Sequence, residues 1–124
     1  MTSIYGRKLL TMAERPRLFK IDTEMQRWCA LLEQELLTWP EVSTKPMFGM
    51  IGFYHGKSIF AAIPRTRAAE TARSLLIKLP GLNDKRLRRA SEPGSGWVTY
   101  ELESANDIPE ALTWLESAYE TNSQ

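Results

Sequence analysis

Residues 46–64, PMFGMIGFYHGKSIFAAIP, decide the fold that this sequence predicts. Two runs rich in aromatic residues, Ile and Met flank His55-Gly56, and glycine adopts the positive φ that a two-residue turn requires. The stretch therefore predicts a β-hairpin. Because strand side chains alternate, one face of the hairpin is expected to hold Gly49, Ile51, Phe53, Ser58, Phe60 and Ala62.

Two segments have apolar residues at helical spacing. The first helix is expected from Thr23 to Trp39, with Pro40 ending it. Its apolar face comprises Met25, Trp28, Cys29, Leu32 and Leu36. The second is expected near residues 107–120, with an apolar face of Ile108, Ala111, Leu112, Leu115, Ala118 and Tyr119. Thr23 with Gln26, and Asp107 with Glu110, have the spacing of a capping box.

The remaining segments predict further strands and one short helix. Residues 42–45 lead into the hairpin as an extended segment, and residues 97–102 alternate as a strand whose inward side chains are Val98, Tyr100 and Leu102. Residues 65–79 fit either one helix or a short helix at 66–72 followed by a strand at 74–79, and the apolar spacing suits both. Asn83 is a candidate N-cap for a basic helix at 84–91.

These elements predict an α+β domain in which helices pack on an antiparallel sheet of about five strands. A chain of 124 residues is long enough for one such domain. We expect the domain to span residues 21–124, preceded by an irregular basic N-terminal arm over residues 1–20. Met12 is an alternative start to Met1.

Several parts of the chain resemble the N-terminal domain of the TfoX/Sxy family of bacterial competence regulators. The matching stretches are Lys45-Pro-Met-Phe-Gly49, Phe53-Tyr-His-Gly56, Ile59-Phe-Ala-Ala62, Leu76-Ile-Lys-Leu-Pro80 and Glu110-Ala-Leu-Thr-Trp-Leu115. The resemblance implies a fold related to YjbR-type and secretion-chaperone-like domains, with a strand at 75–79. We therefore favour a short helix at 66–72 followed by a strand at 74–79. The connection at 64–73 is longer than is usual in that family, and we expect no counterpart of the family's second, C-terminal domain.

We expect the protein to reside in a reducing cytoplasm, because its single cysteine cannot form an internal disulfide. No apolar run approaches the roughly 20 residues of a membrane helix. The first twenty residues lack a long apolar stretch, so no signal peptide is expected.

The net charge of +1 conceals a segregation of charge along the chain. Residues 57–92 hold nine Lys/Arg against three acids, whereas residues 93–124 hold six acids and no Lys or Arg. The candidate contact residues for a protein partner or nucleic acid are Lys85, Arg86, Arg88, Arg89, Arg65 and Arg67. Four charges within five helical residues cannot all face one way, which favours a solvated helix face. The acidic block also weakens any long-range attraction of DNA to the basic block, so nucleic acid is not the favoured partner.

The other chemistry-bearing residues favour structural roles. His55 is expected to be an exposed turn residue, and Cys29 a buried, inert thiol. Gly49 and Gly52 lie inside the predicted strand, where they indicate a bulge or close backbone packing. Glu101 and Glu103 are expected to be solvated. The four tryptophans are expected to be core or half-buried: Trp28, Trp39, Trp97 and Trp114.

No nucleophile–base set and no metal-ligand spacing appears in the sequence, so we expect no enzymatic activity, no cofactor and no metal. The resemblance implies a regulatory, transcription-linked protein-interaction domain. The alternative is a small-ligand- or peptide-binding, chaperone-like domain. In either case we expect a monomer or weak dimer that does not bind membranes.

Overall fold

The computed structural model describes residues 18–80, 84–89 and 96–123 of the chain. Its main sheet has six strands in the order β2-β3-β4-β6-β8-β7, each antiparallel to its neighbours. A separate two-stranded sheet pairs β1 with β5. The strands are β1 (Leu18–Lys20), β2 (Val42–Met47), β3 (Met50–His55), β4 (Ser58–Pro64), β5 (Arg67–Ala69), β6 (Ser74–Lys78), β7 (Arg88–Arg89) and β8 (Trp97–Glu101).

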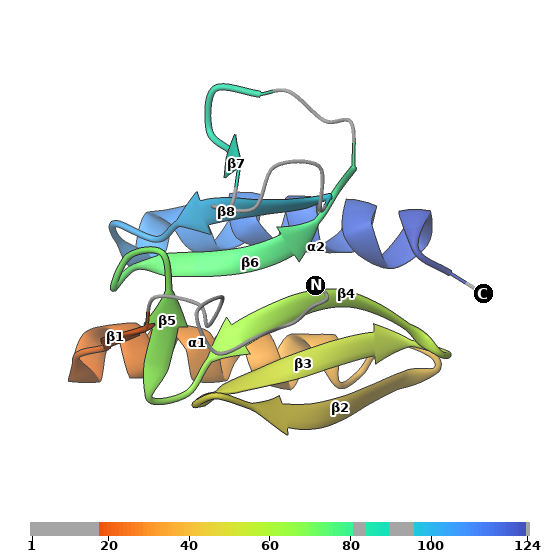
Figure 1. Ribbon diagram of the computed structural model, residues 1–124, viewed down its shortest axis with the longest axis horizontal. Coiled ribbons are helices and arrows are strands. Elements are labelled where there is room, and N and C mark those ends of the chain that lie inside the picture. Colours follow the sequence, from red (N-terminus) through yellow and green to blue (C-terminus); the bar gives the residue numbers. More distant parts are fainter. Residues whose placement is uncertain (1–17, 81–83, 90–95, 124) are drawn as a thin grey trace, which may run out of the picture.

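Two helices of 14 residues each, α1 (Thr23–Leu36) and α2 (Ile108–Thr121), pack on the sheet. Helix α1 contacts β4, and α2 contacts both β4 and β6. Figure 1 shows α1 behind β3 and β4 and α2 behind β6 and β8. The α+β class predicted from the sequence is confirmed. Neither helix is long and apolar enough to cross a lipid bilayer within the described part of the chain.

The apolar face predicted for the first helix is confirmed, because its five members are all buried in α1. The capping box was wrong: the N-cap is Asp22, whose Oδ1 accepts a hydrogen bond from the backbone N–H of Met25 at 2.9 Å. The helix also ends before Trp39. The backbone N–H of Trp39 donates to the carbonyl of Leu36, three residues back, which tightens the chain ahead of Pro40.

The predicted hairpin exists as β3–β4, but its turn lies one residue later than expected. His55 pairs with Ser58, so Gly56 and Lys57 form the turn. The register then shifts between Phe53 and Tyr54, where β4 carries one extra residue. Ile51, Phe53 and Phe60 do join the main core as predicted, but the bulge places Ala61 in that core and Ala62 in a second cluster with Met50.

Gly56 takes a φ of +63° in this turn, a conformation that β-branched residues resist. We therefore expect Gly56→Val to lower the free energy of unfolding by about 1–3 kcal/mol. Urea denaturation followed by circular dichroism measures this. An unchanged unfolding midpoint would contradict the assignment of a left-handed residue to this position.

A second hairpin, β2–β3, turns at Phe48 and Gly49, which have φ values of +52° and +79°. The prediction that Gly49 lies inside a strand was wrong. Gly52 does lie in β3, where a Cβ would come within 2.8 Å of Met47 Sδ, so the expected close packing is confirmed there.

The connection predicted as a helix at 66–72 is instead a strand, β5, that pairs with β1. Residues 18–20 therefore belong to a strand and not to an irregular arm, and the rest of that arm lies outside the described residues. The strand predicted at 74–79 is confirmed and corresponds to β6. The spacing of apolar residues wrongly indicated a helix at 66–72, because small residues such as the buried Ala68 and Ala69 suit a helix or a strand. The strand β1 that pairs with β5 also lies some fifty residues earlier in the chain.

The end of the domain follows the predicted pattern more closely. In and just after β8, Val98, Tyr100 and Leu102 are buried as expected. On α2, three of the six predicted residues are buried (Ala111, Leu115 and Ala118), and the others are partly buried against the core. The second capping box was wrong, because the N-cap Asp107 makes no side-chain cap hydrogen bond.

Candidate functional site

The predicted basic helix at 84–91 is absent from the described residues of that segment. Lys85 and Arg86 form a turn, in which Asp84 Oδ1 accepts a hydrogen bond from the backbone N–H of Arg86 at 2.9 Å. Arg88 and Arg89 then pair with Thr99 and Val98 as strand β7. A short polar side chain that bonds two residues ahead stabilises a turn instead of a helix. Asn83, the expected N-cap, lies outside the described residues.

The six predicted basic residues are divided between two places. Lys85, Arg86 and Arg88 line a hollow beside β7 and β8. Arg65 lines a different hollow, between α1 and the end of β4. Arg67 begins β5, and the backbone of Arg89 belongs to β7. The structure therefore does not bring Arg65 and Arg67 into one patch with the other four.

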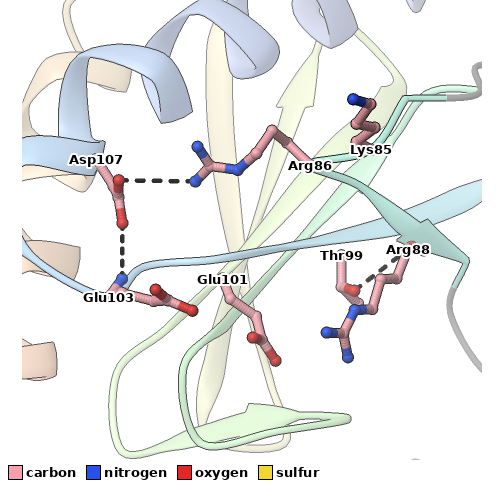
Figure 2. A pocket seen from close by; sticks show the side chains of 7 residues that line it. All are labelled: Lys85, Arg86, Arg88, Thr99, Glu101, Glu103 and Asp107. Carbon is pink, nitrogen blue, oxygen red and sulfur yellow. Dashed lines mark hydrogen bonds and ion pairs between the residues drawn. The ribbon is translucent and has the colours of Figure 1, made fainter.

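The hollow beside β7 and β8 has a volume of about 230 Å³ and a strongly polar lining. Figure 2 shows that its side chains come from the turn before β7, from both strands and from the segment ahead of α2. The lining residues are Lys85, Arg86, Arg88, Thr99, Glu101, Glu103 and Asp107. Three cations thus face three carboxylates. This charged hollow is a mixed-charge site, and the carboxylates disfavour a phosphate ligand.

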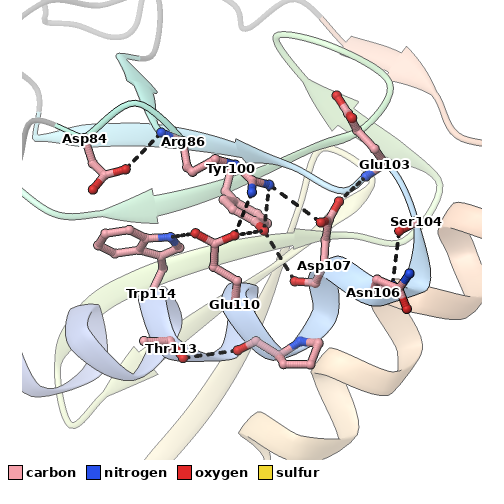
Figure 3. A network of polar contacts seen from close by, with 11 residues as sticks. Asp84, Arg86, Tyr100, Glu103, Ser104, Asn106, Asp107, Glu110, Thr113 and Trp114 are labelled. Carbon is pink, nitrogen blue, oxygen red and sulfur yellow. Dashed lines mark hydrogen bonds and ion pairs between the residues drawn. The ribbon is translucent and has the colours of Figure 1, made fainter.

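Arg86 lies at the centre of a polar network that joins the β7 turn to β8 and α2 (Figure 3). Its Nη1 lies 2.9 Å from Glu110 Oε1, and its Nη2 lies 3.6 Å from Asp107 Oδ1. Nη2 also donates to the Tyr100 hydroxyl at 3.0 Å, and that hydroxyl donates to Glu110 Oε1 at 2.9 Å. Glu110 and Asp107 therefore hold Arg86 in place, which explains why neither carboxylate serves in the predicted capping box.

The Tyr100 hydroxyl stays protonated in this network. Burial raises the pKa of Tyr100, and the hydrogen bond and negative charge of Glu110 raise it further, while the positive charge of Arg86 opposes them. The hydroxyl can therefore donate to Glu110 and accept from Arg86 at the same time. The network is a fixed frame along one side of the hollow.

Four charged side chains that line the hollow have no partner among the described residues. Lys85, Arg88, Glu101 and Glu103 form no side-chain ion pair or hydrogen bond with any other described residue. Glu101 is half-buried, and the other three are exposed. Counting only partners among the described residues, the candidate site is thus two unpaired cations and two unpaired carboxylates beside this polar network.

A comparison with family models identifies the domain. Residues 22–122 match the model described as a domain of unknown function, DUF5655. The chain belongs to the DUF5655 family. No curated protein and no solved structure matches the chain significantly. The resemblance of this DUF5655 domain to TfoX N-terminal domains stays a prediction.

His55 of the DUF5655 domain is not the exposed turn residue that the sequence predicted. Its side chain is only 14% exposed and stacks on Tyr119 of α2, with ring centroids 3.9 Å apart. Its Nδ1 lies 2.7 Å from the carbonyl oxygen of Tyr119 and therefore donates to it. The histidine ties the β3–β4 turn to the end of α2. No short-range signal in the sequence indicates this contact, because the two residues are 64 positions apart.

The remaining candidates in the DUF5655 domain have the expected structural roles. Cys29 is buried, and burial raises the pKa of its thiol to about 12, with a further contribution from Glu33. Such a thiol is unreactive at neutral pH. Trp28 is buried, whereas Trp39, Trp97 and Trp114 are partly buried. Within the described ranges, no group of three His, Cys, Asp or Glu residues could hold a metal ion.

Proposed function

We propose that this chain is a non-enzymatic protein-interaction domain whose charged hollow binds a protein segment carrying charges of both signs. One observation carries the proposal: Lys85 and Arg88 face Glu101 and Glu103 around a hollow, and none of the four is paired with a described residue. The resemblance to competence regulators supports a regulatory role in the cytoplasm of a bacterium. A transcription-linked partner is the form that this role would take.

The chemistry of the hollow favours a peptide segment over an apolar small molecule. Sites for small molecules usually exceed about 300 Å³ and have mainly apolar walls. The charged hollow is smaller, at about 230 Å³, and its lining is polar. Exposed charges contribute mostly to specificity and association rate, and salt screens them. The contact is therefore weak, selective for charge pattern and sensitive to salt.

A defined peptide set tests this proposal by nuclear magnetic resonance. We expect a peptide of alternating Lys and Glu to shift the amide signals of residues 85–88 and 99–103 more than all-Lys or all-Glu peptides of equal length. Lys85→Gln combined with Arg88→Gln should weaken this binding and leave the fold intact, because surface substitutions usually change stability by less than about 0.5 kcal/mol each. Equal shifts from all three peptides would contradict the proposal.

The matched control is Arg27→Gln combined with Lys57→Gln, which removes the same charge from exposed positions outside the hollow. It should bind the alternating peptide as the wild type does. Duplex DNA serves as the competing probe. Tight DNA binding at about 150 mM salt, lost only in the Lys85/Arg88 variant, would favour a nucleic-acid partner instead.

The second hollow supports the alternative function, a small-ligand- or peptide-binding, chaperone-like domain. It measures about 350 Å³ and lies between helix α1 and the end of strand β4. Its lining residues are Gln26, Ala30, Glu33, Pro64, Arg65 and Thr66. Arg65 Nη2 lies 2.6 Å from Glu33 Oε2 across α1 and β4. Thermal shift assays against metabolite and peptide libraries test this alternative, and no stabilisation at saturating ligand would contradict it.

A further inference from the structure

Phe48 occupies a position in the β2–β3 turn that does not suit its side chain. Its φ is +52°, in the left-handed region that bulky residues rarely adopt. Asn, Asp and Gly are the usual residues where both turn positions have positive φ. Phe48 is also 60% exposed, more than any other exposed large hydrophobic residue among those described. Neither its backbone conformation nor its exposure stabilises the fold, so the aromatic ring points to a contact outside the domain.

The turn that carries Phe48 is firmly anchored. The carbonyl oxygen of Gly49 accepts hydrogen bonds from the backbone N–H groups of Arg65, Thr66 and Arg67, at 2.9, 2.9 and 3.2 Å. The side chain of Arg67 lies against Gly49, where a Cβ would come within 2.7 Å of Arg67 Cγ. In Figure 1 the β2–β3 turn and the connection from β4 to β5 lie at the same end of the sheet. Phe48 thus lies on a preorganised turn whose next residue, Gly49, packs against Arg67.

A pair of like charges lies next to this turn. Lys20 of β1 is directly opposite Arg67 of β5, and both residues are exposed. Like charges directly opposite across two strands destabilise the pair. Neither side chain forms an ion pair with any residue in the described ranges. The pair would be relieved by an anionic group from another molecule.

We infer that Phe48, Arg67 and Lys20 form a docking surface for an acidic protein partner, in which Phe48 enters an apolar pocket rimmed by carboxylates. Aromatic and Arg residues together are typical of the energetic centre of protein interfaces. A single aromatic ring with two cations would attach a domain only weakly to a membrane, because stable membrane anchoring takes more than one such feature. A rigid, preorganised turn favours a shaped protein pocket, because preorganisation lowers the entropic cost of docking. This surface shares no lining residue with the charged hollow, and the inference does not depend on the proposed function.

Photo-crosslinking tests the docking surface. The probe is p-benzoylphenylalanine placed at position 48 and irradiated in a lysate of the source cells, with the same group at position 37 as control, since Leu37 is also 52% exposed. We expect position 48, but not position 37, to crosslink a protein, and mass spectrometry to place the crosslink in a segment flanked by Asp or Glu. Lys20→Glu combined with Arg67→Glu should abolish the crosslink.

The crosslinked protein is then purified and titrated against the wild-type domain and Phe48→Asn. Asn suits the turn, so the variant should melt at the same temperature as the wild type or higher, while its Kd weakens at least about tenfold. A lower melting temperature would show that Phe48 stabilises the fold and would overturn the inference. A crosslink to lipid, to nucleic acid, to a second copy of the chain, or to nothing beyond the control would overturn it as well.

Discussion

Leu115→Ala is expected to lower the free energy of unfolding by about 2–5 kcal/mol. Leu115 is fully buried on α2, within the core that both helices form with the sheet. The truncation removes buried apolar surface and leaves a cavity that the surrounding side chains fill only in part. Domains of this size are usually stable by about 5–15 kcal/mol, so a large share of the stability would be lost.

Urea denaturation followed by tryptophan fluorescence measures the effect of Leu115→Ala. The matched control is Leu37→Ala, the same substitution at a leucine that is 52% exposed beside the end of α1. The control should stay within about 0.5 kcal/mol of the wild type. Equal losses for the two variants would place Leu115 outside the core and contradict the packing of α2.

Gly49→Ala is expected to cost roughly 2–5 kcal/mol, because two effects add. An L residue at a φ of +79° is strained by about 1–2 kcal/mol. The new Cβ would also lie 2.7 Å from Arg67 Cγ and 2.9 Å from Thr66 Oγ1. Relieving this overlap must move the β4–β5 connection, and overpacking of this kind typically costs about 1–3 kcal/mol.

Gly96→Ala separates the two effects. Gly96 has a similar φ of +86°, but the nearest atom to its Cβ would be Pro80 Cβ at 3.4 Å, an ordinary contact. Its substitution should cost only the backbone strain, about 1–2 kcal/mol. Chemical denaturation of both variants gives the comparison. A Gly49→Ala variant no less stable than Gly96→Ala would show that the β2–β3 turn does not pack against Arg67.

Part of the candidate site could be predicted from the sequence. The cations Lys85, Arg86 and Arg88 were identified from their clustering, and all three line the charged hollow. Glu101 and Glu103 were expected to be solvated, Asp107 was expected in a capping box, and the place of all three in the same hollow was missed. The signal was present in the chain: a basic block is followed by an acidic one, and β7 pairs with β8 to bring the two together. Linear sequence shows the charges, but only the strand pairing shows which of them share a surface.

By itself, the sequence determined the elements whose signal is local. The apolar spacing of α1, the alternation through β8 and the core position of Leu115 follow from periodicities of 3.6 and 2, which each segment carries within itself. Only the tertiary structure decided the β1–β5 pair, the replacement of a basic helix by β7, and the stacking of His55 on Tyr119. The physical reason is that a strand satisfies its backbone hydrogen bonds with a partner distant in sequence, so its stability depends on neighbours that no short window contains.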